Sequence, residues 1–183
     1  MRDNIILTGF MGSGKTSVGI RLSYSLRRTM IDTDKWIEKK QGMTVSEIFA
    51  EEGEEAFRNM ETKCLQELLK TTDHQIISVG GGLPVREENR QLLSRLGRVF
   101  YLKASPETIY ERLKTDTTRP LLQVADPLAQ IKRLSEAREE AYASCADVVV
   151  DVSERSFDEI LEVIMGGLKD DRKERYRDET ISD

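Results

Sequence analysis

The chain alternates short apolar runs with longer segments in which apolar residues recur every three or four positions. The short runs predict buried strands of a parallel sheet, because both faces of such a sheet are covered and its strands read as continuous apolar segments. The longer segments predict helices that turn one apolar face toward the sheet. Strands are expected at residues 4–8, 29–32, 75–79, 98–102 and 147–152.

Helices are predicted in the segments between and after these strands. Val18, Leu22 and Leu26 lie on one face of the first helix. Thr44 and Glu47 have the spacing of a capping box, in which each side chain bonds the backbone at the start of a helix. The other predicted helices cover residues 35–41, 44–52, 55–70, 87–94, 106–114, 127–144 and 156–167.

Strands that alternate with helices indicate an α/β fold, here a five-stranded parallel sheet with helices on both faces. In such folds, ligands bind at the carboxyl ends of the strands. Residues 1–168 are predicted to form one domain, because the chain is long enough for a single core and contains no internal repeat. Residues 169–183 carry eleven charged side chains without apolar periodicity, so this tail is expected to be mobile.

Composition and charge exclude several classes of protein. The net charge of −5 gives no reason to expect nucleic acid or an acidic membrane as a partner. The N-terminus lacks the pattern of a signal sequence, and no apolar run approaches the roughly 18 residues of a membrane span. The two cysteines have no metal-like spacing, and Cys64 shares a helical face with Met60 and Leu68, as expected for a buried reduced thiol. A soluble, cytoplasmic monomer is expected.

The segment GFMGSGKT, Gly9 to Thr16, fits the phosphate-binding pattern G-x-x-x-x-G-K-[ST] between a predicted strand and a predicted helix. Glycines let backbone amides surround phosphates, and the helix N-terminus adds partial positive charge. Lys15 is expected to reach the β- and γ-phosphates, and Thr16 to offer its hydroxyl to Mg²⁺. The alternative is a glycine-rich turn that matches by chance. The predicted nucleotide-binding residues of this segment are Gly12, Ser13, Gly14, Lys15, Thr16 and Ser17.

A phosphate-binding loop does not identify the reaction. A signalling GTPase would need a guanine-reading N-K-x-D, and no such string occurs in the sequence. A nucleotide-binding regulator without turnover is harder to exclude. Three further polar clusters favour phosphoryl transfer to a small acceptor.

Asp32 and Asp34 form the first of these clusters. They follow an apolar run, and side chains two apart in a strand point to the same side, so both carboxylates are expected to face one place. Such a pair can hold a metal, hold a substrate or remove a proton. Alternatively, Asp34 caps the helix that follows, since Asp is a favoured N-cap residue.

The second and third clusters lie further along the chain. Arg58 and Glu61 are three residues apart on a predicted helix and are therefore neighbours, as in an ordinary surface ion pair. Gly80, Gly81 and Gly82 follow a strand and predict a loop that a ligand approaches closely.

Two arginines are candidates for binding anions. Arg119 precedes Pro120, which favours an extended backbone, and lies in a polar segment at about residues 114–126 that is a candidate lid. Arg138 can grip a carboxylate with two parallel hydrogen bonds. Alternatively, it pairs with a neighbouring acid such as Glu139 on the helix surface.

Taken in order, these motifs resemble the shikimate kinase family. The match runs through GFMGSGKT, DTD, FR with Glu61 three residues on, GGG, RPLL and EAREEAY, and covers roughly residues 4–167. The resemblance implies a P-loop kinase of the nucleoside-monophosphate-kinase-like fold, with a lid and a substrate-binding region at about residues 32–62. It also implies ATP and shikimate as substrates, Mg²⁺ as cofactor, and phosphorylation of the 3-hydroxyl of shikimate in aromatic amino acid biosynthesis.

The resemblance assigns roles in catalysis and in metal binding. Phosphoryl transfer is largely a matter of positioning and charge stabilisation, so Asp34 is expected to be a positioner first and a general base second. Asp32 would act near Mg²⁺ through water. The implied catalytic residues are Lys15, Asp34 and Arg119, and the implied metal-binding residues are Thr16 and Asp32.

The resemblance also implies the binding residues of the two substrates. Glu61 would orient Arg58. Arg112 resembles the arginine that stacks on adenine in this family, and Arg155 follows the last strand, where the adenine site also forms. The nucleotide site would therefore extend to Arg112, Arg119 and Arg155. The implied shikimate-binding residues are Asp34, Arg58, Gly80, Gly81, Gly82 and Arg138.

The chain departs from the family pattern in its lid and in its tail. The lid lacks the second basic residue that the family often has, because Thr115, Asp116, Thr117 and Thr118 precede Arg119. The tail extends beyond the family pattern. Another small-acceptor kinase of the same fold, for gluconate or a nucleoside monophosphate, is the alternative enzyme, although the compact acid, arginine and glycine set suits a polyhydroxy acid better. An ATP-binding regulator is the alternative that is not an enzyme.

Overall fold

The structure is a computed structural model that describes the backbone of residues 2–116 and 124–180 and, within these ranges, side chains as far as Lys169. A five-stranded sheet has the order β2-β3-β1-β4-β5. All four strand pairs are parallel, which confirms the predicted sheet. The strands are β1 (Ile5–Thr8), β2 (Met30–Asp32), β3 (Ile76–Ser78), β4 (Arg98–Lys103) and β5 (Val148–Asp151).

Helices connect the strands and follow the last of them, as the sequence pattern predicted. A capping box starts α3, because the Thr44 hydroxyl accepts from the Glu47 amide while the Glu47 carboxylate accepts from the Thr44 amide. A short 3₁₀ helix, η1 (Leu83–Val85), follows the triple glycine. The α-helices are α1 (Lys15–Leu26), α2 (Thr33–Gln41), α3 (Val45–Glu51), α4 (Gly53–Thr71), α5 (Glu87–Leu96), α6 (Pro106–Leu113), α7 (Pro127–Cys145) and α8 (Phe157–Thr180).

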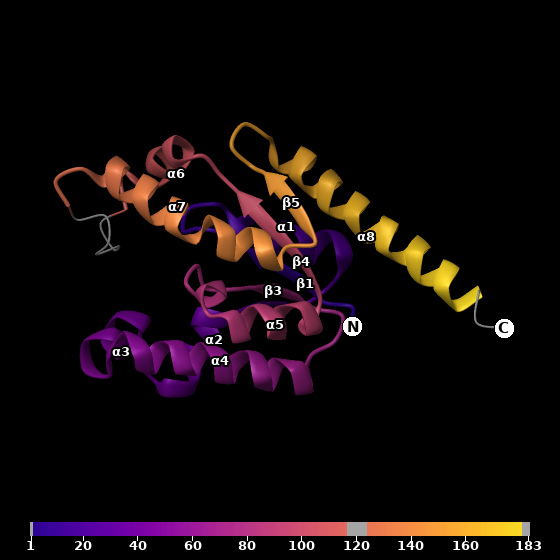
Figure 1. Ribbon diagram of the computed structural model, residues 1–183, viewed down its shortest axis with the longest axis horizontal. Coiled ribbons are helices and arrows are strands. Elements are labelled where there is room, and N and C mark those ends of the chain that lie inside the picture. Colours follow the sequence, from indigo (N-terminus) through magenta and orange to yellow (C-terminus); the bar gives the residue numbers. More distant parts are fainter. Residues whose placement is uncertain (1, 117–123, 181–183) are drawn as a thin grey trace.

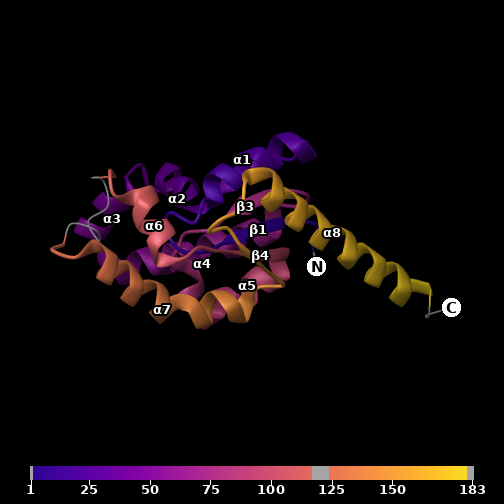
Figure 2. The ribbon, with the colours of Figure 1, turned by 90° about the horizontal axis from the view of Figure 1, so that it is seen from above.

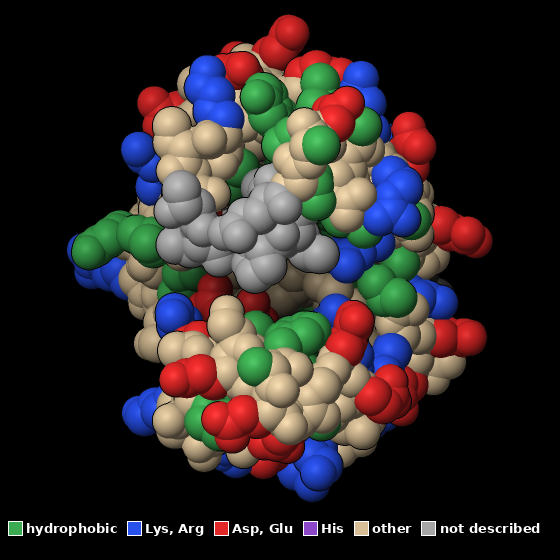
Figure 3. All heavy atoms as spheres, turned by 90° about the vertical axis from the view of Figure 1, so that its left-hand side faces the viewer, with side chains coloured by type: hydrophobic (Ala, Val, Ile, Leu, Met, Phe, Trp, Pro, Cys, Tyr) green, Lys and Arg blue, Asp and Glu red, His purple; other side chains and the backbone are tan. Residues whose placement is uncertain are grey.

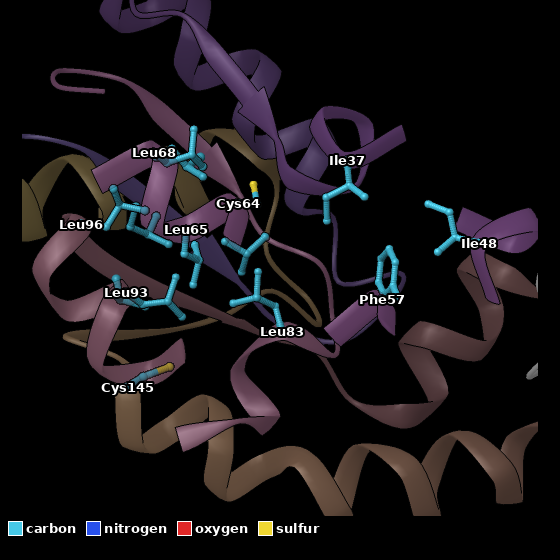
Figure 4. Close-up of a cluster of buried hydrophobic side chains, with 14 residues drawn as sticks. Ile37, Ile48, Phe57, Cys64, Leu65, Leu68, Leu83, Leu93, Leu96 and Cys145 are labelled. Atoms are coloured by element: carbon cyan, nitrogen blue, oxygen red, sulfur yellow. The ribbon is translucent and has the colours of Figure 1, made fainter. Parts of the chain in front are cut away.

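Helices cover both faces of the sheet, as Figures 1 and 2 show. Ile5 and Leu7 of β1 pack in one apolar cluster with α1 and α8. Ile6, which points the other way, packs in a second cluster with α2, α4 and α5, shown in Figure 4. A third cluster joins the loop after β1 to β4, α6 and α7 through residues that include Phe10 and Tyr142. The carboxyl ends of the strands are therefore held by packing from both sides.

Helix α8 is longer than the sequence indicated. It was predicted to end at Gly167, but it continues to Thr180. A Cβ on Gly167 would lie 3.0 Å from Cε1 of Phe100, so this glycine allows the helix to approach β4 closely and does not mark its end. Figures 1 and 2 show the C-terminal part of α8 extending away from the rest of the domain. The mobility of residues 169–183 stays a prediction, and residues 181–183 lie outside the described ranges.

Cys64 and Cys145 are both buried and unpaired, which confirms the buried thiol expected for Cys64. Burial raises the pKa of the Cys64 thiol to about 12, so the group stays protonated at neutral pH. In the described part of the chain, no helix combines the length and the apolar character needed to cross a membrane.

Candidate active site

The phosphate-binding loop joins the end of β1, in the middle of the sheet, to the start of α1. Gly12 and Gly14 have φ of 75° and 96°, a left-handed backbone that side chains with a Cβ rarely adopt. Nζ of Lys15 lies 2.8 Å from the carbonyl oxygen of Gly9 and 3.0 Å from that of Phe10, and donates to both. The ammonium group is thus held over the loop whose shape suits a phosphate chain.

The other predicted residues of this loop take different positions. The hydroxyl of Ser13 is buried and has no hydrogen-bond partner among the described residues. Thr16 and Ser17 lie exposed on the first turn of α1, where the partial positive charge of the helix favours an anion. Gly12 to Ser17 therefore lie in or beside one loop, and their binding of a nucleotide stays a prediction.

Asp32 and Asp34 are neighbours, but the strand geometry expected for them is wrong. β2 ends at Asp32, and α2 starts directly after it, so Asp34 belongs to the helix. The capping residue is Asp32 and not Asp34, because Oδ1 of Asp32 accepts from the backbone amides of Asp34 and Lys35 at 3.1 and 3.3 Å. Oδ2 of Asp32 accepts from the hydroxyl of Ser78 at 3.3 Å.

The carboxylate of Asp34 does not cap the helix and is buried near Asp32 and Lys15. Its Oδ1 is buried and has no hydrogen-bond partner among the described residues. Burial is the main cause that raises the pKa of Asp34 to about 6, and the negative charge of Asp32 adds to the rise. The charge of Lys15 opposes it, which links this carboxylate to the phosphate loop. Asp34 can therefore exchange a proton near neutral pH.

Arg58 and Glu61 on α4 form an ion pair, but it is not the ordinary surface pair that the spacing alone suggested. Nη1 of Arg58 lies 2.7 Å from Oε2 of Glu61, whose side chain is 1% exposed. Nη2 of Arg58 also lies 2.9 Å from the exposed Glu54. Burial raises the pKa of Glu61 to about 7, although Arg58 opposes the rise. Oε1 of Glu61, like Oδ1 of Asp34, is buried without a partner in the described structure.

The three glycines after β3 bring backbone against these side chains. A Cβ on Gly80 would lie 2.5 Å from Oδ1 of Asp34 and 3.0 Å from Oε1 of Glu61. A Cβ on Gly82 would lie 2.3 Å from Nη1 of Arg58. Two unpartnered carboxylate oxygens and a guanidinium therefore converge on one loop, which explains why glycine is needed there.

Arg138 approaches the phosphate loop from α7. Its guanidinium carbon lies 5.8 Å from the ring centre of Phe10, a residue of the phosphate loop. The side chain is half-buried. The alternative pairing with Glu139 is wrong, because that carboxylate instead accepts from Tyr101 and Lys103, both at 2.6 Å. Arg138 thus faces the phosphate loop.

The two arginines assigned to the adenine site lie beyond the phosphate loop. Nη1 of Arg112 donates to the carbonyl of Gly12 at 3.2 Å, and its Nη2 donates to that of Val152 at 2.9 Å. Arg112 therefore bridges the loop and the segment after β5. Arg155 is exposed in that segment. Hydrogen bonds from Ser153 lower the pKa of Asp151, and the positive charge of Arg155 adds a smaller contribution. Arg119 lies outside the described residues.

On the face of the molecule that contains this region, the surface is hollowed, and acidic and basic side chains gather around the hollow (Figure 3). These acidic and basic groups can bind different parts of a ligand. Two carboxylates of raised pKa can accept hydrogen bonds from hydroxyl groups, two arginines can hold an acid, and the glycine loop with Lys15 can hold phosphates. An acceptor with several hydroxyls and a carboxylate fits this set better than a nucleotide acceptor, which would also need a base pocket.

Comparison with known proteins decides among the kinases of this fold. Residues 11–169 match the family described as shikimate kinase. The chain belongs to the shikimate kinase family. Among curated relatives named shikimate kinase, that of Symbiobacterium thermophilum is 43% identical over 91% of this chain and 97% of the relative. The shikimate kinase of Bacillus anthracis is 44% identical over 86% of this chain and 93% of the relative.

Solved structures agree with this family assignment. A shikimate kinase from Acinetobacter baumannii in complex with shikimate has a TM-score of 0.85 and 34% identity, over 93% of this chain and 95% of that chain. A gluconokinase from Sinorhizobium meliloti has a TM-score of 0.58 and 16% identity over 97% of both chains, and shares the fold alone. The predicted P-loop kinase fold is confirmed, and this member of the shikimate kinase family is an ATP-dependent kinase.

Tyr142 was not predicted to have a role, although it lies in the EAREEAY string. Its hydroxyl donates to the carbonyl oxygen of Gly81 at 2.5 Å. Its position four residues after Arg138 was the available signal, since residues four apart share a helix face.

Proposed function

We propose that this chain transfers the γ-phosphoryl group of ATP to the 3-hydroxyl of shikimate, giving shikimate 3-phosphate and ADP in aromatic amino acid biosynthesis. The observation that carries the proposal is the convergence of Oδ1 of Asp34 and Oε1 of Glu61 beside Arg58. Buried acceptors without partners favour a ligand that brings hydroxyl donors, because unpaired buried polar atoms are unfavourable. Shikimate carries three hydroxyls and one carboxylate.

The substrate-binding roles follow from charge. Arg58 and Arg138 bind the carboxylate of shikimate, and Asp34 accepts a hydrogen bond from a hydroxyl. The loop of Gly80, Gly81 and Gly82 supplies backbone groups at close range. Glu61 binds Arg58 and thereby orients it, as the 2.7 Å ion pair supports.

Asp34 has two roles in the transfer step. It holds the 3-hydroxyl in line with the γ-phosphoryl group, and it takes the proton as the new P–O bond forms. Its pKa of about 6 leaves it largely ionised at neutral pH while keeping it basic enough to accept a proton. Lys15 neutralises charge on the transferred phosphoryl group, and Arg119, outside the described residues, is proposed to do so from the lid side.

Mg²⁺ is proposed to bind with the nucleotide. The described residues contain no group of three His, Cys, Asp or Glu side chains that could hold a metal ion. Thr16 is exposed beside the loop, and both oxygens of Asp32 already accept hydrogen bonds, so Thr16 fits direct ligation and Asp32 fits contact through water. The ion supplies charge neutralisation at the phosphates when bound. Arg112 and Arg155 are proposed to bind the adenine.

The cellular location and the oligomeric state of the chain complete the proposal. Buried, unpaired cysteines are typical of a reducing compartment, which supports a cytoplasmic location. The chain is also proposed to be a monomer. Light scattering of the purified chain measures its mass in solution.

A coupled assay of ADP release tests the proposal with shikimate, gluconate and AMP supplied in turn. Among these three acceptors, only shikimate is expected to give ADP release. Lys15→Met is expected to abolish it with unchanged circular dichroism, because the variant lacks the ammonium group that faces the phosphates. Faster turnover with gluconate or AMP, or full activity in Lys15→Met, would contradict the proposal.

A further inference from the structure

Tyr142 is a fully buried tyrosine, 0% exposed, on the side of α7 that faces the glycine loop. Its hydroxyl donates to the carbonyl oxygen of Gly81 at 2.5 Å. These two residues are 61 positions apart in the sequence. Through this hydrogen bond, a side chain of α7 holds the backbone of the triple-glycine loop.

Gly81 sits at the junction of the two substrate sites. A Cβ on Gly81 would lie 3.5 Å from the carbonyl oxygen of Gly9 and 3.6 Å from the amide nitrogen of Met11, both in the phosphate loop. The same Cβ would lie 3.8 Å from the hydroxyl oxygen of Tyr142. The middle glycine is thus enclosed between the phosphate loop and α7, and Tyr142 fixes its carbonyl.

Tyr142 also bears on Arg138, one helical turn earlier. Burial raises the pKa of Tyr142 to about 12, while the nearby positive charge of Arg138 opposes the rise. Arg138 in turn faces the ring of Phe10. One phenol hydroxyl therefore binds the glycine loop and lies close to an arginine that the proposed function assigns to shikimate.

We propose that Tyr142 is a positioning residue for the acceptor. Through its hydroxyl it sets the distance between the Gly81 backbone and the Arg138 guanidinium, and so the width of the shikimate site next to the phosphate loop. The proposal rests on the proposed function and adds to it a residue that touches neither substrate. Without the hydroxyl, the carbonyl of Gly81 loses its donor and Arg138 loses a neighbour.

Tyr101 provides a matched control. It is also buried, at 4% exposed, in the same apolar cluster, and its ring centre lies 5.2 Å from that of Tyr142. Its hydroxyl, however, donates to the carboxylate of Glu139 and not to the glycine loop. Tyr101→Phe therefore removes the same group from the same cluster without touching the loop.

The experiment compares Tyr142→Phe with Tyr101→Phe. Shikimate affinity and ATP affinity are measured separately by titration calorimetry, and steady-state kinetics and thermal unfolding are recorded for both variants. Tyr142→Phe is expected to raise the Kd and KM for shikimate by about 3- to 10-fold, the effect of losing one hydrogen bond. ATP affinity without shikimate is expected to stay at the wild-type value, and so is shikimate affinity in Tyr101→Phe.

The outcomes separate the inference from the proposed function. If Tyr142→Phe binds shikimate as well as wild type does, Tyr142 only fills the core and the inference is wrong. Equal losses for both ligands, or equal losses in both variants, also overturn it. If wild type itself shows no shikimate-dependent ADP release, the proposed function fails first.

Discussion

At the scale of single residues, the charge state of Asp34 decides what the acceptor site can do. Its pKa is raised to about 6, mainly by burial and then by Asp32. Below that pH the carboxyl is protonated and cannot accept the proton of an attacking hydroxyl. We therefore expect kcat/KM for shikimate to rise with pH through about 6, measured between pH 5 and 8. An activity that stays flat down to pH 5 would show that proton transfer to Asp34 does not limit the reaction.

The matched variant is Asp34→Asn, which keeps the shape and removes the charge. The rate is expected to fall by ~10²–10⁴ while ATP affinity stays unchanged.

The substitution Asp34→Asn also tests the contribution of this carboxyl group to stability. A raised pKa in the folded state means that the stabilising contribution is present below the unfolded value of 3.8 and is lost as pH rises through about 6. Asp34→Asn should therefore lose less stability than wild type between pH 5 and pH 7 in urea unfolding.

Residue types predicted much of this site, but their local geometry was harder to predict. The phosphate loop follows from a string of eight letters, because its function depends on backbone and on one lysine. The two aspartates were correctly placed together, yet a strand spacing was assumed where α2 already begins at Thr33. The contact of Tyr142 with Gly81 joins distant parts of the chain, and no local pattern indicates it.

At the scale of elements, the triple-glycine loop lies close to α4 because its residues have no side chains. A Cβ on Gly82 would meet Nη1 and Nη2 of Arg58 at 2.3 and 2.5 Å. A guanidinium is the flexible end of its side chain, so Gly82→Ala should displace Arg58 more than it disturbs folding. We expect the KM for shikimate to rise by roughly 10- to 100-fold, the effect of losing a charge-assisted contact, with little change in melting temperature.

Gly166→Ala is the control for this loop variant. Gly166 lies in α8, and a Cβ there would meet nothing within 4 Å. Alanine at this site should stabilise the protein by about 0.5–1 kcal/mol and leave the KM unchanged. If Gly82→Ala also binds shikimate normally, Arg58 does not contact the substrate.

The order of elements could be predicted because each strand is a short apolar run and most helices carry a strong apolar period. Their ends were less certain, since caps and tertiary contacts set them. Asp32 caps α2, so the helix begins at Thr33, two residues before the predicted start at Lys35. Gly167 looked like a helix end, but packing against Phe100 explains it.

At the scale of the whole molecule, α8 divides into a part that packs on the sheet and a part that extends away from it. Ile160 and Ile164 are buried, and Leu168 packs against the same cluster. Figures 1 and 2 show the rest of the helix leaving the domain. Among the described side chains, the packing of α8 against the sheet extends to Leu168, and the domain boundary at residue 168 stays a prediction.

Deleting residues 171–183 is accordingly expected to leave the melting temperature and the specific activity almost unchanged, because the packed residues Ile160, Ile164 and Leu168 all remain. The control deletion, residues 164–183, also removes Ile164, which is 0% exposed. Losing a buried isoleucine is worth about 2–5 kcal/mol, which lowers the melting temperature of a domain of this size by roughly 10 °C. Calorimetric scans of both truncations check this. A large drop in the shorter deletion would mean that the tail docks on the domain, and that the core extends beyond Leu168.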